Sequence, residues 1–359
     1  MKILILGAGK MGSFFTDLLS FEHEVAVLES DPKRMRFIYN ALRLQKPEEV
    51  AEFKPELVIN CVTLSYTIEA FKSVKDSRKP VVVHINTLKG KGYAPAEKNK
   101  EAWHYNGPFK IETGKPLYEM TEEDYSDISL NYLLDKMKKD PAVVAITSGT
   151  PTVMGFTEDK RKEAGKQFVD VGIAEETAVA LASGIAANGG KPVYGVYSTF
   201  VQRTYDQIAQ DLCINNSPAT IVTFCGSVYG MNDVTHLGLY DIPMMANIPN
   251  LVYLAPTTKE EYLAMLDWSI EQNEHPVAIR LPGGSVISAG KKITKDFGDL
   301  NKYEVTQNGS KVAVIGLGTF YGLGKEVAEE LKKVTGTDAT VINPYYITGI
   351  DAELLEELK

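Results

Sequence analysis

A glycine-rich turn near the N-terminus has the residue types and spacing of a nucleotide site. Gly7, Gly9 and Gly12 follow an apolar run at residues 2–6 and precede a helical pattern. Glycines there allow a tight turn and let a pyrophosphate reach backbone N–H groups at the helix N-terminus. Glu29 ends the next apolar run, where a carboxylate would accept a hydrogen bond from a ribose hydroxyl. The pattern predicts a dinucleotide site, and the alternative is that the glycines only permit close packing of helix on strand.

A second group combines a carboxylate, two aromatic rings and a guanidinium. Glu175 lies where the apolar run FVDVG turns into a helical pattern, and Tyr197, Phe200 and Arg203 share the motif YSTFVQR. Aromatic faces can hold a flat heterocycle while a guanidinium donates to its edge. Parallel strands bring their carboxyl ends together, so we expect these side chains and His236 to converge. Alternatively, Glu175 complements the helix dipole and the rings belong to the core.

Composition limits the class of protein. With 359 residues, 44% hydrophobic and 24% charged, the chain is expected to form two or three globular domains. A net charge of -9 argues against nucleic acid as a partner, because phosphate backbones need a basic face. Three cysteines without CxxC spacing predict neither a disulfide framework nor a metal site. These cysteines fit a reducing cytoplasm best, and a small-molecule substrate is expected. No apolar run reaches membrane-spanning length.

Short β-branched runs alternate with helical patterns along the chain, which predicts an α/β fold of doubly wound parallel sheets. We expect a Rossmann-like dinucleotide-binding fragment at 1–71 and an irregular linker at 72–120. A second α/β domain is expected at 121–288, and a shorter third unit at 303–359. The expected strands are residues 2–6, 24–28, 57–62, 81–85, 143–146, 168–171, 193–196, 220–224, 251–254, 277–280, 311–315 and 339–343.

The N-terminal segment resembles the start of prephenate dehydrogenases, through GAGKMGSFFTDLLS and ESDPKRMRFIYN. The resemblance covers only the first half of that family's nucleotide domain. It implies NAD as a cofactor here, and Glu29 would repel the 2′-phosphate of NADP. Lys33 and Arg34 leave that choice open. Hydride transfer is not expected, because the family's nicotinamide half and substrate domain have no counterpart in the sequence.

The rest of the chain resembles 1-deoxy-D-xylulose-5-phosphate synthase, a thiamine-diphosphate enzyme of the transketolase type. Six motifs occur in the family's order between residues 80 and 284. They are VVVHINTLKGKGYAPAEKN, WHYNGPFKIETG, FVDVGIAEE, YSTFVQRTYDQ, THLGLYD and VAIRLPGG. The resemblance implies that the linker at 72–120 includes the end of a diphosphate-domain remnant. It also implies a transketolase-type pyrimidine-binding domain at 121–288 and a truncated transketolase C-terminal domain at 303–359.

The resemblance implies a role for each matching residue. Glu175 would hydrogen-bond the aminopyrimidine ring of thiamine diphosphate, which requires a buried carboxyl. Tyr197, Phe200 and Arg203 would form the pyrimidine pocket, with Phe200 stacking on the ring. Three further residues would act on the substrate: His236 and His104 as proton-handling groups, and Arg280 as the ligand of its phosphate.

The sequence departs from the family at several of these motifs. Where the family usually has EQHA, this chain has Glu175-Glu176-Thr177-Ala178. Where the family has GxDGxTHxG, this chain has GMNDVTHLG, which sets Asn232 at the aspartate position and Asp233 at a glycine position. Cys225 stands where a second phosphate-binding arginine is usual, and RYPRG has become RLPGG. Recognition of an acceptor phosphate is therefore in doubt.

A whole motif is also missing. The family binds the cofactor's diphosphate through Mg²⁺ with a GDG…N motif, and no GDG occurs in this sequence. By the resemblance, we therefore expect a thiamine-diphosphate-dependent carboligase of the isoprenoid and thiamine precursor pathway. This chain alone would be incomplete, and another domain or chain would supply the Mg²⁺ site. The expected partner is a second copy in a homodimer or a chain that carries the diphosphate domain. The alternatives are an NAD-binding or regulatory module and an inactive fusion product.

Overall fold

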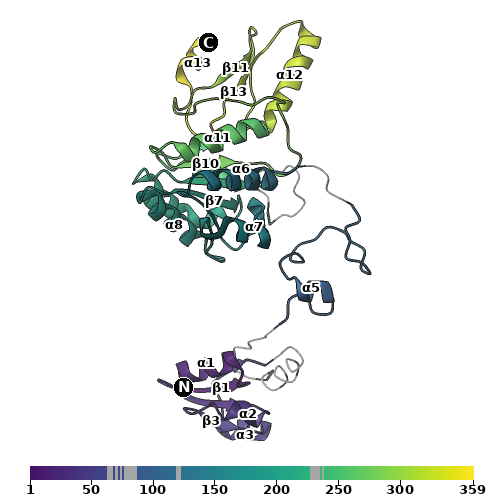
Figure 1. Ribbon diagram of the computed structural model, residues 1–359, viewed down its shortest axis with the longest axis vertical. Coiled ribbons are helices and arrows are strands. Elements are labelled where there is room, and N and C mark those ends of the chain that lie inside the picture. The colour runs from purple at the N-terminus through teal and green to yellow at the C-terminus, as the bar shows by residue number, and fades with distance from the viewer. Residues whose placement is uncertain are drawn as a thin grey trace. The chain divides into compact units, whose positions relative to one another are not determined.

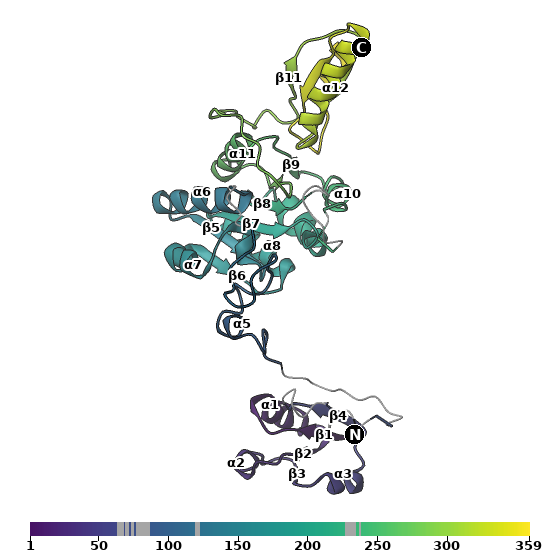
Figure 2. The same cartoon turned by 90° about the vertical axis from the view of Figure 1, so that its right-hand side faces the viewer.

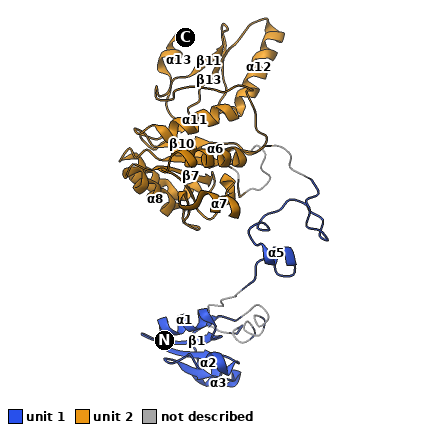
Figure 3. Cartoon of the chain, viewed as in Figure 1, with its two compact units in different colours: residues 1–120 blue, residues 121–359 orange. Residues whose placement is uncertain are grey.

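The structure is a computed structural model with two compact units. It describes residues 1–62, 68, 72, 75–76, 87–118, 123–226, 235–236 and 238–359. Unit 1 spans Met1–Met120 and unit 2 spans Thr121–Lys359 (Figure 3). The two units are described separately below.

Unit 1 contains a four-stranded parallel sheet in the order β3-β2-β1-β4. This is the order of the first four strands of a doubly wound nucleotide-binding sheet. One face packs Ile3, Ile5 and Ile59 against α1, and the other packs Leu4, Leu6 and Val58 around Phe53. The elements are β1 (Lys2–Leu6), α1 (Lys10–Leu19), β2 (Glu24–Leu28), α2 (Pro32–Met35), β3 (Leu42–Leu44), α3 (Pro47–Phe53) and β4 (Leu57–Asn60).

The remaining described part of unit 1, residues 87–118, is irregular apart from α5 (Ala94–Lys98). Three rings hold it together: Trp103 lies 5.0 Å from Tyr93 and 4.9 Å from Phe109, centroid to centroid. Gly114, at φ +70°, brings the backbone against the Trp103 ring, where a Cβ would lie 3.1 Å from ring carbons. The strand expected at 81–85 lies outside the described residues.

Unit 2 is built on a six-stranded parallel sheet in the order β6-β5-β7-β8-β10-β9. Helices α6, α7 and α11 cover one face, and α8, α10 and the π-helix at Ile208–Cys213 cover the other (Figures 1 and 2). The strands are β5 (Val143–Thr147), β6 (Phe168–Asp170), β7 (Lys191–Tyr197), β8 (Thr220–Phe224), β9 (Val252–Leu254) and β10 (Val277–Arg280). The α-helices are α6 (Tyr125–Lys139), α7 (Glu158–Ala164), α8 (Glu175–Ala187), α9 (Tyr205–Gln207), α10 (Asp241–Met245) and α11 (Lys259–Glu271).

A smaller sheet, β11-β13-β12, completes unit 2. It comprises β11 (Glu304–Gln307), β12 (Ala313–Ile315), α12 (Phe320–Thr335), β13 (Thr340–Asn343) and α13 (Ala352–Glu357). β12 pairs with β13 in parallel, but β11 pairs with it antiparallel, so this sheet is mixed. The chain beyond β13 returns to the large sheet, where Ile347 N–H donates to the Tyr253 carbonyl at 2.7 Å. The expected α/β class with doubly wound parallel sheets is confirmed, with this one antiparallel exception.

Candidate functional site

A buried ion pair lies at the carboxyl edge of the large sheet. Glu175 is the first residue of α8, directly after the turn that follows β6, and is only 2% exposed. Arg203 Nη1 donates to Glu175 Oε1 at 2.6 Å, while the Arg203 side chain remains 50% exposed. The sequence predicted that the Arg203 guanidinium would donate to the edge of a bound flat ring. In the structure it binds the carboxylate instead, because the turn after β7 brings it over the start of α8.

Three aromatic side chains lie next to the Glu175–Arg203 pair. Tyr197 ends β7, and its ring centroid lies 5.5 Å from Phe200 and 5.6 Å from His236. The Phe200 ring lies 5.3 Å from His236 and 5.6 Å from the guanidinium carbon of Arg203. The five side chains expected to converge therefore form one contiguous set, which we call the edge cluster. An acid, a base and aromatic faces at one sheet edge can bind a flat polar ring.

A second ion pair lies further along the same edge. Arg280, the last residue of β10, donates from Nε to Asp241 Oδ2 at 2.6 Å and from Nη2 to the Gly238 carbonyl at 2.7 Å. Asp241 is fully buried and also accepts from the Tyr253 hydroxyl at 2.8 Å. Burial raises the pKa of Tyr253, so its hydroxyl stays protonated as a donor. The arginine expected to grip a phosphate is thus bound by a carboxylate that sequence reasoning did not single out.

Tight backbone packing joins the two ion pairs. Ser198, which follows Tyr197, donates its hydroxyl to the Cys225 carbonyl at 2.9 Å. A Cβ on Gly226 would lie 2.6 Å from Arg280 Cγ, and one on Gly238 would lie 2.4 Å from Ser198 Oγ. A Cβ on Gly238 would also lie 2.6 Å from the Gly226 Cα, so only glycine lets these two backbone segments come so close, whereas a side chain at Gly226 would force Arg280 to shift.

Cys225, which the resemblance sets at an arginine position, directly follows β8. It has a positive φ of 55°, which is uncommon for a residue other than glycine. Burial raises the pKa of the Cys225 thiol to about 11, and the nearby Asp124 carboxylate adds to the effect. The thiol is therefore neutral at physiological pH. Asn232 and Asp233 lie outside the described residues.

Two threonine hydroxyls at the same edge lack hydrogen-bond partners. The Oγ1 atoms of Thr150, after β5, and Thr199, after β7, are buried and unpaired. The turn containing Thr150 abuts the one before Glu175, since a Cβ on Gly149 would lie 3.0 Å from Ile173 Cγ1. Buried unpaired hydroxyls are rare in native proteins, and each one calls for a specific explanation such as an ordered water or a catalytic role. No periodic pattern in the sequence signals them.

The glycine turn of unit 1 has the geometry of an open helix N-terminus. Gly9 caps α1 without a side-chain hydrogen bond, and a Cβ on Gly9 would meet nothing within 4 Å. A Cβ on Gly12 would lie 1.8 Å from the Gly7 carbonyl oxygen, so only glycine allows α1 to approach β1. Glu29 Oε2 accepts from the Ala8 N–H at 2.8 Å, which places the carboxylate directly beside the turn.

The side-chain amide of Asn60 is buried at the carboxyl end of β4, in the same sheet as β1. Asn60 is fully buried, in register with Leu6 of β1, and its Nδ2 has no hydrogen-bond partner. His104, the other predicted site residue of unit 1, belongs to the segment 87–118 and contacts Lys89 Nζ through its Nδ1.

Among the described residues, no group of three or more histidine, cysteine or acidic side chains could hold a metal ion. Within the same residues, no helix combines the length and apolarity needed to cross a bilayer.

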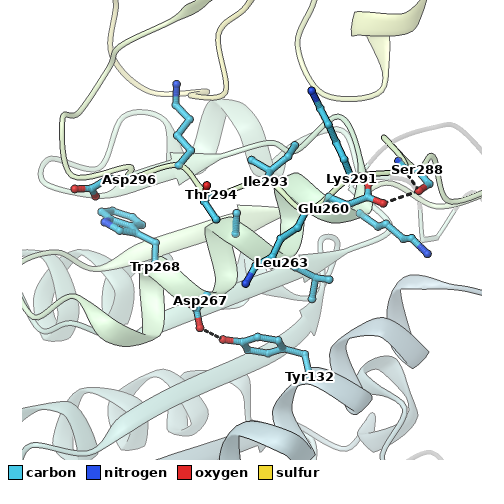
Figure 4. A pocket seen from close by; sticks show the side chains of 15 residues that line it. Tyr132, Glu260, Leu263, Asp267, Trp268, Ser288, Lys291, Ile293, Thr294 and Asp296 are labelled. Carbon is cyan, nitrogen blue, oxygen red and sulfur yellow. Dashed lines mark hydrogen bonds between the residues drawn. The ribbon is translucent and has the colours of Figure 1, made fainter.

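A separate concavity of about 1070 Å³ lies along α11 (Figure 4). Leu263 and Trp268 of α11 line it, and the chain at residues 288–296 crosses over it. Ser288 Oγ and the Ala289 N–H bind Glu260, which fixes that crossing segment to the helix. This concavity shares no residue with the edge cluster. We take the edge cluster as the candidate site, because the concavity brings together no buried acid or base.

Comparison with known proteins identifies the class of the central domain. Residues 122–287 match the family model described as the transketolase pyrimidine-binding domain. The chain therefore contains a segment of the transketolase family, which agrees with the resemblance of its motifs.

Particular relatives refine this assignment. The curated 1-deoxy-D-xylulose-5-phosphate synthase of Crocosphaera subtropica is 37% identical over 300 residues, covering 82% of this chain and 46% of the relative. That of Natranaerobius thermophilus is 38% identical over 294 residues, covering 81% and 46%. That of Rippkaea orientalis is 33% identical over 350 residues, covering 95% and 53%, so the alignment extends into unit 1. The chain spans about half the length of these relatives.

One solved structure has the same fold over much of the chain. It is described as "Split gene transketolase, inactive beta4 tetramer", with a TM-score of 0.56 and 23% identity, covering 66% of this chain and 76% of that one. At this identity the likeness concerns the fold alone. The prephenate dehydrogenase-like origin of residues 1–71 stays a prediction.

Proposed function

We propose that this chain is one component of a thiamine-diphosphate-dependent carboligase of the transketolase type, similar to 1-deoxy-D-xylulose-5-phosphate synthase. The buried Glu175 carboxylate, at a sheet edge beside the Tyr197 and Phe200 rings, carries the proposal. The cofactor, when bound, supplies a heterocycle that stabilises a carbanion. Glu175 would hold the proton at the aminopyrimidine ring, and Arg203 would fix the orientation of that carboxylate.

The residues present fit the pyrimidine half of the cofactor. The buried carboxylate offers an acceptor, the Phe200 ring offers a stacking face, and the unpaired Thr150 and Thr199 hydroxyls offer further hydrogen bonds. The diphosphate half needs a hard cation with several oxygen ligands. The sequence has no GDG motif to supply them. We therefore propose that another chain or domain binds the diphosphate and Mg²⁺.

The description of the solved structure with the same fold offers an analogy for a divided enzyme. Its printed description is that of an inactive tetramer from a split-gene transketolase. By analogy, we expect this chain to be inactive when purified alone and to act in an assembly. A homodimer without a complementary chain is the alternative arrangement.

The test is an assay of complementation with matched variants. The chain, thiamine diphosphate, Mg²⁺, pyruvate and either glyceraldehyde or glyceraldehyde 3-phosphate should give no turnover above background. Adding a chain that carries the diphosphate-binding domain should produce activity, and Glu175→Ala should abolish it. Glu176→Ala removes the exposed neighbouring carboxylate and should leave activity intact. Turnover by the isolated chain, if lost in Glu175→Ala, would disprove the divided enzyme.

A second function is proposed for unit 1, namely binding of NAD(H). The uncapped start of α1, the Glu29 carboxylate beside Ala8 N–H and the unpaired Nδ2 of Asn60 favour it. Backbone N–H groups at the helix start would hold the pyrophosphate. Glu29 would accept from the ribose and repel a 2′-phosphate. Tighter binding of NADP(H) than of NAD(H) in a titration would contradict this preference.

A further inference from the structure

The small sheet of unit 2 has an open edge at β12. Among the described residues, β12 pairs with β13 alone, and β13 lies between β12 and β11. Val312 and Gly316 both bond to β13, so by alternation the peptide groups of Ala313 and Ile315 point to the open edge. β12 has the sequence AVI, without the charge or proline that discourages pairing at an edge strand. The edge is therefore free to accept another strand.

Helix α12 packs along one face of this sheet, and its contacts follow the order of the strands (Figures 1 and 2). The Tyr321 hydroxyl donates to Thr306 Oγ1 of β11 at 2.8 Å. Ala328 packs against β13, and a Cβ on Gly324 would lie 3.3 Å from Val314 of β12. At about 100° per residue, these three helix positions succeed one another around α12 in the same order as the strands beneath them.

Four apolar side chains continue this progression past β12. Phe320, Leu323, Val327 and Val334 follow Gly324 around the helix on the side away from β13, and each is about half exposed or more. They form a stripe along α12, which we call the overhanging stripe. In a wider sheet this stripe would cover the strand next to β12. Contiguous exposed apolar side chains of this kind mark an interaction surface.

The spacing of the overhanging stripe fits a second copy of the same chain. Phe320, Val327 and Val334 are seven residues apart. An antiparallel pairing about Val327 therefore sets Phe320 against Val334 of the second copy, and Val327 against its own counterpart. Each contact is then apolar on both sides, as a self-complementary interface requires. The charged residues Lys325 and Glu329 lie on the opposite face of the helix.

The dimensions of a joined sheet agree with this pairing. α12 covers both β12 and β13, so its axis lies about half a strand spacing inside the open edge. When β12 pairs with its counterpart, the two helix axes are two strand spacings, or about 9.6 Å, apart. Packed helices have interaxial distances of about 8–10 Å. A two-fold axis normal to the sheet thus satisfies the strand edge and the helix stripe together.

The large sheet of unit 2 does not obstruct such pairing. Residues just after β9 meet the small sheet at its carboxyl end, where the Ala255 N–H donates to the Tyr345 carbonyl at 2.7 Å. A Cβ on Gly318, after β12, would lie 3.5 Å from the Ala255 Cβ. Antiparallel pairing of β12 points the two copies in opposite directions. The two large sheets therefore lie at opposite ends of the joined sheet.

We propose that β12 and α12 form an interface between two copies of this chain. In it, β12 pairs antiparallel with its counterpart, and the overhanging stripe packs against the same stripe of the second copy. This interface shares no residue with the edge cluster. A chain without the proposed carboligase function would still associate through it, so the two proposals stand or fall separately.

The variant Val327→Cys tests the geometry in the full chain. Two Cα atoms about 2.3 Å from helix axes that lie about 9.6 Å apart come within about 5 Å of each other, inside the range of a disulfide. Mild oxidation should therefore link most of this variant into covalent dimers. Glu329→Cys, on the opposite face of α12, should give no more dimer than the natural chain with its three free cysteines. No cross-linking of Val327→Cys, or equal cross-linking of both variants, would overturn the proposal.

Sedimentation equilibrium of the full chain over a range of concentrations measures the association itself. Val327→Lys brings two ammonium groups into one apolar contact and should raise the dissociation constant at least about tenfold, equivalent to about 1.4 kcal/mol. Ile315→Lys adds the charge that natural edge strands carry, and should weaken association in the same direction. Glu329→Lys is the matched control and should have no effect, with circular dichroism confirming that all variants fold. Association that neither Val327→Lys nor Ile315→Lys weakens would contradict the interface.

A different occupant of the overhanging stripe would also be recognised. The natural chain would then not associate with itself, but it would bind the complementary diphosphate-domain chain, and Val327→Lys would abolish that binding. This result would assign the stripe to the complementary chain and overturn the pairing of two copies. A natural chain that shows neither kind of association would overturn the proposal as well.

Discussion

The Glu175–Arg203 pair is the contact on which the edge cluster depends. Removing the guanidinium by Arg203→Gln leaves a carboxylate that is 2% exposed without its cation. Because Arg203 is half exposed, we expect a loss of about 1–3 kcal/mol in the free energy of unfolding, the cost of one unsatisfied buried group. Urea unfolding followed by circular dichroism measures this loss.

Two further variants show whether the pairing itself is responsible. Lys166→Gln, at an exposed lysine, should change the stability by less than about 0.5 kcal/mol. Arg203→Gln should cost much less in a chain that already carries Glu175→Gln, because the neutral amide needs no cation. An equal cost in both backgrounds would show that Arg203 stabilises the fold through other contacts.

For individual residues, the sequence predicted where the side chains with functional groups lie, but not which partners they bind. Glu175, Tyr197 and Phe200 were found because each follows a recognisable strand. Asp241 was missed, since a buried aspartate in a short helix has no periodic signature. The partner of Arg203 was missed because it lies 28 positions away in the sequence. Such pairings depend on how strands and turns align in three dimensions.

A charge network ties α6 and α11 to the start of β7. Lys136 lies 2.7 Å from both Asp267 and Glu271, and Lys191 bridges Glu271 at 2.7 Å and Asp140 at 2.9 Å. The hydrogen bonds from Lys136 and then Lys191 lower the pKa of Glu271 below its ordinary value of 4.5. Glu271 thus stabilises the fold in its ionised form. Its contribution to the free energy of unfolding is fully present only above about pH 4.5.

We expect Glu271→Gln to lower the free energy of unfolding by about 0.2–1 kcal/mol at neutral pH, as for exposed ion pairs. The difference from the natural chain should shrink as pH falls below about 4.5, because protonation in the folded state removes the same contribution. Urea unfolding at neutral pH and at about pH 3 checks this, with Glu326→Gln on exposed α12 as control. A difference independent of pH would show that Glu271 acts through packing.

Most elements were predictable from hydrophobic periodicity, and the exceptions share a physical cause. β2, β8 and β10 have the bounds that the sequence indicated. β3 was missed because two of its three residues are exposed, and β11 because its sequence, EVTQ, is mostly polar. Both are edge strands whose formation depends on pairing with an apolar neighbour. Their own composition therefore carries little signal.

The whole chain combines two open sheet edges, one in each compact unit, that suit different ligands. In unit 1 the edge offers backbone N–H groups and a carboxylate, which suits a nucleotide. In unit 2 it offers a buried acid and aromatic faces, which suits a pyrimidine. The motifs separated these two parts in the sequence, but the contacts within each part, such as those of Glu29 with the Ala8 N–H and of Glu175 with Arg203, come only from the structure.

Hydrogen–deuterium exchange on the full-length chain tests this assignment of ligands to units. NADH should protect amides at residues 5–31 and 57–62, because it would bind the N–H groups at the start of α1 and contact Glu29. A ligand at 100 times its dissociation constant stabilises the state that binds it by about 2.7 kcal/mol, enough to slow local opening about a hundredfold. Thiamine diphosphate with Mg²⁺ and the complementary chain should instead protect residues 171–178 and 197–205. Glu29→Gln should weaken only the first pattern and Glu175→Gln only the second. Protection of unit 2 by NADH, or no protection by NADH anywhere, would leave unit 1 without the proposed nucleotide function.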